Sequence, residues 1–449
     1  MSDAVRVIGG GLAGCEAAYQ LARRGVAVEL YEMRPRRGTE AHRTESLAEL
    51  VCSNSLRDDS LATAVGVLKT EMRSLDSLIL RVADSVRVPA GSALAVDRDK
   101  FARGVTEAIE AEPLIDVRRE EVEKLPEEGT TIVATGPLTS PSLSASIAEM
   151  LGSEHLYFYD AIAPIVTADS IDMDIAYRAS RYGRGSGDDY INCPLDEEQY
   201  RQFVADVLAA DTMPLKSFER CAYFEGCMPI EEIARRGPQT LSFGPMRPVG
   251  LEDPRTGLRP HAVVQLRQDD VEGRLFSMVG FQTKMTYPEQ RRVLRTIPGL
   301  AAVEFVRLGS LHRNTYIDSP KALAPSLEVR ARPGLFLAGQ LVGVEGYVES
   351  TATGLLAGIN VARRVAGAEP VVPPATTALG SLLAYVTEPA RRDFQPMNAN
   401  YGLFPPLERR MRGREKKAAL GERALAALRA WVASAEPSGD PRVCISRPA

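Results

Sequence analysis

The stretch Val5-Arg6-Val7-Ile8-Gly9-Gly10-Gly11-Leu12-Ala13-Gly14 decides the fold of this chain. Its first four residues predict a short buried strand, its glycines predict a tight turn, and the helically spaced apolar residues of 15–25 predict a helix. A second apolar strand over 26–31 ends at Glu32, about 20 residues beyond the glycines. This order is typical of a Rossmann-like dinucleotide-binding unit.

Each part of this turn has a separate task. Gly9 permits the tight turn, Gly11 lets the backbone approach a pyrophosphate, and Gly14 lets the helix pack on the strand. The helix N-terminus offers unpaired N–H groups to the anion, and the acid at the second strand end is placed for a ribose. We therefore assign these positions to a dinucleotide: Gly9, Gly10, Gly11, Gly14 and Glu32.

The glycines alone suit FAD and NAD equally, because both dinucleotides carry a pyrophosphate. Two later apolar strands, within 130–137 and 334–340, favour FAD, since both resemble the additional strand-end motifs of two-dinucleotide-fold flavoproteins. A glycine-rich turn and a small-residue helix over about 349–365 follow the second of them. Gln340 stands where such motifs commonly carry an acid. These strand ends add Thr135, Gly136, Gly339 and Gln340 to the candidate cofactor site.

Motifs at the start, near 135 and near 340 predict a discontinuous nucleotide domain in an α/β protein. We expect residues 1–150 and 330–368 to form this FAD-binding domain, and residues 151–329 to form a mixed α/β insertion domain. Residues 369–449 are expected to form a helical C-terminal segment that packs on the FAD domain. A chain of 449 residues exceeds what one core usually covers, which agrees with this division.

The glycine-rich stretch 182–187 lacks a strong preceding strand, and its third glycine falls one place early for a phosphate loop. We interpret it as a flexible loop. With no second nucleotide fold evident, NAD(P)H would have to reach the flavin in a shared cleft.

Composition indicates a soluble globular protein of the cytoplasm, with no leader and no apolar run long enough to span a bilayer. Six cysteines in so long a chain, without Cys-x-x-Cys spacing, indicate reduced thiols that act singly. Four scattered histidines give no metal-ligand spacing, so we assign no metal. The net charge of −5 requires any polyanionic partner to be met by a local basic patch. The oligomeric state stays open, with a monomer admissible.

Two cysteines lie in sequence contexts that suit a reactive thiol. Cys227 precedes a predicted helix that starts at Pro229 and stops at Gly237, and a helix N-terminus stabilises a thiolate. From the residues alone, a reactive thiol and a buried, unreactive thiol are equally good interpretations of Cys227. Cys52 enters a polar turn ahead of Arg57, which predicts an accessible thiol with a cation nearby.

A basic cluster lies near the C-terminus. By itself it is explained by a solvated charged helix or by the neutralisation of phosphates. Its members are Arg409, Arg410, Arg412, Arg414, Lys416 and Lys417.

Taken together, these segments resemble the folate- and FAD-dependent tRNA (uracil-5-)-methyltransferases, the TrmFO family of bacteria. The resemblance covers almost the whole chain, and the thiol contexts are its more specific part. It is carried by the following stretches: 9–14 with Glu32, 49–57, 224–231, 279–283, 311–316, 339–350 and 394–400.

The resemblance implies transfer of a carbon from 5,10-methylenetetrahydrofolate to C5 of the T-loop uridine at tRNA position 54, with NAD(P)H as reductant through FAD. It implies that Cys227 attacks C6 of uracil and that Cys52 lies near the flavin. It further places Gly346 and Tyr347 at the cofactor, with Tyr347 packed on the isoalloxazine, and makes His312 and Arg313 candidates for the folate pocket. A tRNA substrate also makes the basic cluster a candidate contact with the T-arm, since the target base must be flipped.

Two rival interpretations are kept. One is a GidA-type flavin- and folate-dependent modifier of the tRNA wobble uridine, against which the shortness of this chain counts. The other is a flavin-containing tRNA-binding protein in which catalysis is secondary.

Overall fold

The glycine-rich N-terminus builds the strand, turn and helix that its sequence predicts. The computed structural model describes residues 4–152, 156–213, 228–392, 394–434 and 440–445, without the side chains of 156–161 and 311–313. The central sheet is parallel throughout, in the order β16-β7-β1-β2-β6. Its strands are β1 (Val5–Ile8), β2 (Val28–Tyr31), β6 (Ile115–Arg118), β7 (Thr131–Val133) and β16 (Leu335–Leu337).

Strand β16 joins this sheet from far along the chain, with Leu335 beside Thr131. The first and last strand-end motifs therefore end at the same edge, which confirms the predicted Rossmann-like α/β class. The boundaries at 150, 330 and 368 stay a prediction.

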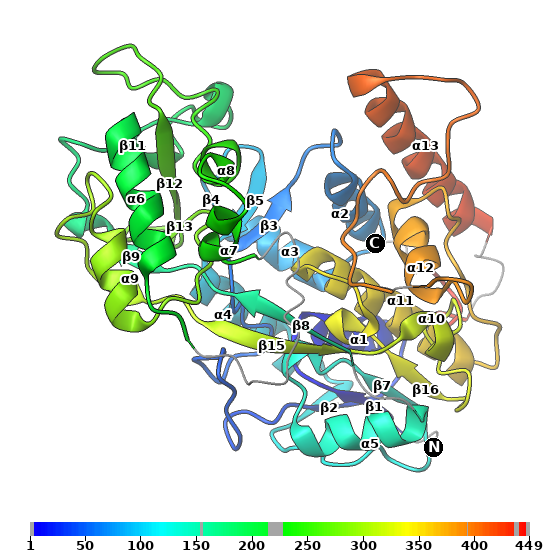
Figure 1. Ribbon diagram of the computed structural model, residues 1–449. Coiled ribbons are helices and arrows are strands. Elements are labelled where there is room, and N and C mark those ends of the chain that lie inside the picture. The colour runs from blue at the N-terminus through cyan, green and yellow to red at the C-terminus, as the bar shows by residue number, and fades with distance from the viewer. Residues whose placement is uncertain (1–3, 153–155, 214–227, 393, 435–439, 446–449) are drawn as a thin grey trace.

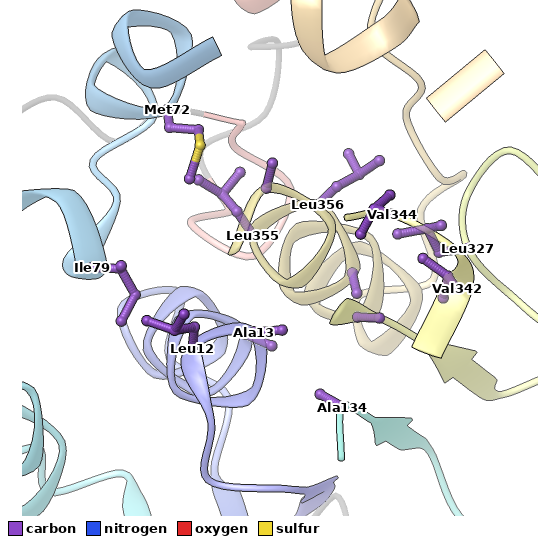
Figure 2. Close-up of a cluster of buried hydrophobic side chains, with 14 of the residues drawn as sticks. Leu12, Ala13, Met72, Ile79, Ala134, Leu327, Val342, Val344, Leu355 and Leu356 are labelled. Atoms are coloured by element: carbon purple, nitrogen blue, oxygen red, sulfur yellow. The ribbon is translucent and has the colours of Figure 1, made fainter. Parts of the chain in front are cut away.

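Two helices pack closely over the central sheet (Figure 2). Helix α1 (Leu12–Ala22) lies against α11 (Tyr347–Val365), and a Cβ on Gly354 would come within 2.2 Å of the Ala13 carbonyl oxygen. Only a residue without a side chain permits this approach. Leu12 and Leu355 extend the contact into the main core, where α2 (Ala64–Ser74) and α3 (Leu78–Ser85) complete the layer.

A small antiparallel sheet that the sequence did not reveal packs against Tyr190 of the insertion. It contains β3 (Ser55–Asp58), β4 (Arg87–Val88) and β5 (Ala93–Val96), and α4 (Arg98–Glu110) follows it. Asp97 caps α4 by accepting from Lys100 N at 2.9 Å, and its other oxygen accepts from Val271 N at 3.0 Å. The cap thus also ties this region to the insertion.

The insertion holds a six-stranded sheet, in the order β10-β11-β12-β13-β9-β14, with its own apolar core. Its strands are β9 (Ile165–Thr167), β10 (Tyr177–Arg178), β11 (Tyr190–Leu195), β12 (Ala262–Gln268), β13 (Leu275–Met278) and β14 (Phe305–Arg307). Its helices are α6 (Glu197–Ala209), α7 (Ile230–Arg235), α8 (Thr240–Phe243) and α9 (Tyr287–Leu294). A two-stranded ribbon of β8 (Leu156–Ala161) and β15 (Leu311–Tyr316) runs between this sheet and the central one (Figure 1).

The remaining helices are α5 (Pro141–Leu151), α10 (Ser319–Ala322), α12 (Ala378–Thr387) and α13 (Gly413–Ser434). Helices α12 and α13 stand on the side of the molecule away from the insertion (Figure 1) and contribute side chains such as Leu382 and Trp431 to the main core. Among the described residues, no helix is long and apolar enough to cross a membrane.

The segment 440–445 is bound to the residues that follow α1. Arg24 is 1% exposed, and its guanidinium donates to the carbonyls of Cys444 (2.9 Å) and Ile445 (2.5 Å). Arg363 of α11 also donates to the carbonyl of Val443. Two buried arginines therefore hold the last described residues of the chain.

Candidate functional site

The glycine turn forms one wall of a cavity, here called the first cavity. A Cβ on Gly14 would lie 1.8 Å from the Gly9 carbonyl oxygen, and one on Gly9 would lie 2.5 Å from that of Ala134, so side chains are excluded. A Cβ on Gly11, by contrast, would meet nothing described within 4 Å, because this glycine faces the cavity. Gly11 also begins α1 without a side-chain cap. Open backbone at a helix N-terminus fits a pyrophosphate.

Glu32 lies at the end of β2 and lines the first cavity, as the sequence predicts. Its Oε2 accepts from Gly10 N at 3.1 Å, and its Oε1 accepts from Arg34 Nε at 2.9 Å. Burial alone would raise the pKa of Glu32, but the hydrogen bonds and charge of Arg34 bring it below its usual value. Glu32 is therefore an anion, held by the turn that it faces.

The rest of the first cavity comes from the other two strand ends. Thr135 and Gly136 follow β7, and Thr135 Oγ1 lies 2.6 Å from Thr139 Oγ1. Gly339 and Gln340 begin the short 3-10 helix η5 (Gly339–Val342) after β16.

His42 also lines the first cavity, although its sequence context gave no signal. Burial and then the charge of Arg34 lower the pKa of His42 to about 4, so the imidazole is neutral near pH 7.

A second cavity adjoins the first. The two share Val51, Pro137, Leu138, Gln340 and Tyr347 in their linings, so a ligand in one would reach the other. The second cavity is also lined by these polar side chains: Cys52, Arg57, Arg267, Gln282, Asn314 and Asn398.

Cys52 and Tyr347 meet at the boundary between the cavities. The Tyr347 hydroxyl accepts from Cys52 N at 2.8 Å and from Ser53 N at 3.3 Å, and it lies 3.0 Å from Cys52 Sγ. Since its lone pairs serve the two N–H groups, its own proton is left to point at the sulfur. Burial, followed by the charge of Cys52, raises the pKa of Tyr347 well above its usual value, so the phenol stays protonated.

Three guanidinium groups that the sequence did not single out act on the Cys52 thiol. Arg98, Arg267 and Arg307 each interact with it electrostatically, and nearby cations favour a thiolate. Arg98 is oriented by a bidentate pair with Asp269, at 3.2 Å for each bond. No local motif marks these residues, because the insertion brings Arg267 and Arg307 to the 52–54 turn only through tertiary packing.

Arg57, the cation predicted near Cys52, lies in the second cavity but points to another partner. It adopts a φ of 65°, and its Nη1 donates to Glu349 Oε1 at 2.8 Å. Buried Lys69 supports this strained residue by donating to the Arg57 carbonyl at 3.0 Å. Gly346, the N-cap of α11, has a φ of 113°, which strains any residue with a side chain and favours glycine.

The remaining predicted residues are placed as follows. Cys227 lies outside the described residues, and the helix predicted after it is α7, with Pro229 as its N-cap. His312 and Arg313 lie in β15, where they pair with Asp160 and Tyr159, but their side chains are not described. The six basic residues from Arg409 to Lys417 are all exposed, at the start of α13 and just before it. No cluster of metal-binding side chains occurs within the described part of the chain.

The glycine-rich loop is not a phosphate loop, because strand β11 rather than a helix follows it. It is also bound to the rest of the molecule: Gly91 N and Ser186 N donate to the carboxylate of Asp189, at 2.5 and 3.2 Å.

Comparisons with known proteins agree with this geometry. The family model described as glucose inhibited division protein A matches residues 4–369. Two crystal forms of Aquifex aeolicus GidA share the fold, with TM-scores of 0.66 and 0.68 at 17% identity, covering 96% of this chain and 73% and 76% of theirs. The fold and the glycine-lined cavity thus define a member of the GidA class of dinucleotide-binding flavoproteins.

Curated relatives narrow the class. Proteins named methylenetetrahydrofolate–tRNA-(uracil-5-)-methyltransferase TrmFO from Geobacter sulfurreducens and Moorella thermoacetica are 60% and 58% identical to this chain. The alignments cover 97% and 98% of this chain and 100% of each relative. The chain therefore belongs to the TrmFO family of tRNA (uracil-5-)-methyltransferases.

Proposed function

We propose that this chain methylates C5 of the uridine at position 54 in the T-loop of tRNA, in the cytoplasm, with 5,10-methylenetetrahydrofolate as the carbon donor and NAD(P)H as the reductant. The observation that carries the proposal is the pair of joined cavities with Cys52 and Tyr347 at their boundary. One cavity suits a dinucleotide and the other a substrate. The names of the relatives supply the reaction class.

FAD is proposed as the resident cofactor. The turn of Gly9, Gly10, Gly11 and Gly14 would hold its pyrophosphate, and Glu32 would face its adenosine ribose. When bound, FAD would supply the redox chemistry that links NAD(P)H to the transferred carbon. Tyr347 and Gln340 line both cavities and so would lie where the ring of the cofactor meets the substrate.

Tyr347 is proposed to control the protonation of Cys52. Its hydroxyl is fixed by two backbone N–H groups, so its proton stays directed at Sγ. With Arg98 and Arg267 adding positive charge, a Cys52 thiolate formed during turnover would be stabilised and could later take back a proton. Cys52 would thereby act as an acid and base beside the reacting carbon.

Cys227 is proposed as the nucleophile. Uracil C5 is a poor nucleophile until a group adds at C6, and a thiolate is soft enough to add there and later to leave. After the carbon has bonded to C5, loss of the C5 proton and departure of the thiolate restore the aromatic ring. The following α7 is anchored by Glu231, whose buried carboxylate accepts from Lys284 N and Met285 N at 3.2 and 3.0 Å.

A GidA-type wobble-uridine activity is the second candidate, and the shared fold favours it. The identity to GidA is only 17%, whereas relatives at 56–60% identity over almost their whole length carry the TrmFO name. The uracil-5 activity is therefore the better supported of the two.

The test is turnover on a T-arm RNA with methylenetetrahydrofolate and NADH or NADPH, followed by mass spectrometry of the product nucleoside. We expect 5-methyluridine at position 54 from the wild type, and neither product nor covalent enzyme–RNA adduct from Cys227→Ala. Cys444→Ala, in the fastened 440–445 segment, is the matched thiol control. Full methylation by Cys227→Ala would refute the nucleophile assignment, and modification of an anticodon-arm RNA instead would favour the GidA-type activity.

A further inference from the structure

A third depression, here called the basic groove, lies beside the site. Its floor is formed by Asp58, at the end of β3, and by the following residues Ser60 to Thr63. One wall is Arg184, from the glycine-rich loop of the insertion, and the other wall is the beginning of α13, with Arg414 and Lys417. Segments more than 200 residues apart in the sequence thus meet around one surface.

The cations of the groove are available to a ligand. Arg184, Arg414 and Lys417 are exposed, and none of them forms an ion pair with any described residue. Arg414 and Lys417 also stand in the first turns of α13, where the helix macrodipole disfavours positive charge. Their position is thus not explained by the stability of the helix.

Two acids, Asp58 and Glu422, also line the groove. Asp58 accepts from Ser60 N at 2.8 Å and from Ser92 Oγ at 2.6 Å, and these hydrogen bonds lower its pKa, so it stays negatively charged. Glu422 is exposed on α13. The three cations therefore outnumber the acids that face the groove.

The Arg184 wall is held in place rather than free. Asp189, two residues after the last glycine of its loop, accepts from Gly91 N in the turn between β4 and β5. Tyr190 Oη donates to the Ala90 carbonyl at 2.9 Å in the same turn. Since β4 and β5 belong to the sheet that carries the floor, this wall and the floor form one scaffold.

Strand β3 connects the groove to the site. Ser55 and Arg57 line the second cavity, and Asp58 and Ser60 line the groove. Arg57 and Asp58 are neighbours in the chain, so the second cavity and the groove adjoin along β3. This arrangement suits a nucleic-acid backbone whose flipped base enters the cavity while neighbouring phosphates stay outside.

We propose that the basic groove binds the sugar-phosphate backbone of the tRNA T-arm beside the target uridine, with Arg184 and the start of α13 gripping it from opposite sides. The inference rests on the proposed tRNA substrate. A chain with a net charge of −5 needs such a local positive surface to attract a polyanion. Arg184 thereby makes the insertion part of the tRNA-binding surface.

The experiment measures the Kd of the flavin-loaded protein for a T-arm RNA over a KCl series. Charge reversals Arg184→Glu and Lys417→Glu are each expected to weaken binding about fivefold or more and to lower the slope of log Kd against log[KCl] by about 1. Arg184→Lys should bind like the wild type, since the contact is to a charge.

Matched controls carry the same charge change outside the groove. Arg259→Glu is exposed in the insertion, and Arg429→Glu is exposed on α13, about 18 Å along the helix from Lys417. If Arg184→Glu gave the same Kd and slope as Arg259→Glu, the groove would be rejected even with methylation intact. If wild-type protein bound the RNA through Arg184 but never methylated it, the proposed function would fail while the groove survived. Equal competition by an anticodon arm would reject the T-arm as the occupant.

Discussion

The hydroxyl of Tyr347 lies 3.0 Å from the sulfur of Cys52 and accepts the Cys52 backbone N–H at 2.8 Å. Almost 300 residues separate the two in the sequence. The aromatic residue expected to pack on a flavin thus also fixes the turn that carries the thiol. Tyr347 thereby links the two cavities chemically as well as spatially.

Tyr347→Phe removes the hydroxyl and keeps the ring. We expect methyl transfer to slow about tenfold or more, the value of one hydrogen bond to a charged group, and alkylation of Cys52 to shift to higher pH because its thiolate loses a donor. Mass-spectrometric quantification of Cys52 alkylation against pH measures this effect. Tyr200→Phe, which deletes a hydroxyl bonded to the Pro238 carbonyl in the insertion, is the control. An unchanged alkylation profile in Tyr347→Phe would remove the role given to its proton.

Asp269→Ala leaves the buried Arg98 without its counter-charge. The side chains are 4% and 12% exposed, and breaking a buried pair by removing one partner costs about 3–5 kcal/mol. Urea unfolding of the flavin-free protein should show this loss. Glu197→Ala breaks an exposed pair with Arg201 and should cost less than about 1 kcal/mol. Similar losses in both variants would mean that Arg98 is not held as described.

His42 predicts a pH effect. Its folded pKa of about 4 lies below the ordinary value of 6.5, so between these values the unfolded chain binds the extra proton. The contribution of His42 to stability is therefore full above pH 6.5 and is lost as the pH falls towards 4. In His42→Asn, the fall in unfolding free energy between pH 6.5 and 4 should be smaller than in the wild type. Equal slopes would show that the imidazole protonates freely in the folded protein.

Gly14→Ala and Gly11→Ala separate the two tasks of the glycine turn. A Cβ at position 14 collides with the Gly9 carbonyl, so that variant should lose about 1–3 kcal/mol or more of stability. A Cβ at position 11 meets open space and should change stability by less than about 1 kcal/mol, yet it would intrude on the dinucleotide. Thermal unfolding and the flavin absorbance of the purified proteins distinguish the effects. Full flavin content in Gly11→Ala would contradict the cradle.

The sequence could predict the features that depend on local pattern. The spacing of Gly9, Gly11 and Gly14 predicts the strand, turn and helix that form. Asp196 and Gln199 form a capping box at the start of α6, which is also a local signal in the sequence. One predicted boundary is displaced: helix α11 begins at Tyr347, two residues before the expected start, because Gly346 serves as its N-cap.

Features that depend on packing between distant segments could not be predicted. Arg98, Arg267 and Arg307 have ordinary sequence surroundings. The start of α4 brings Arg98 to the Cys52 thiol, and the docking of the insertion against the 52–54 turn brings Arg267 and Arg307. The small sheet of β3, β4 and β5 could not be predicted for a different reason. Its strands are too short to show a clear alternation of apolar and polar residues.

The clamp of Arg24 on Ile445 has a consequence for biosynthesis. Arg24 follows the C-terminal end of α1, and two of the carbonyls that accept from its buried guanidinium, those of Cys444 and Ile445, are synthesised 420 and 421 residues later. Until then, of the described acceptors, only the carbonyl and side-chain oxygens of Gln20 are present to bind this guanidinium. The N-terminal unit should therefore mature only after translation of the far end, and nascent chains halted before residue 440 should remain sensitive to protease near α1.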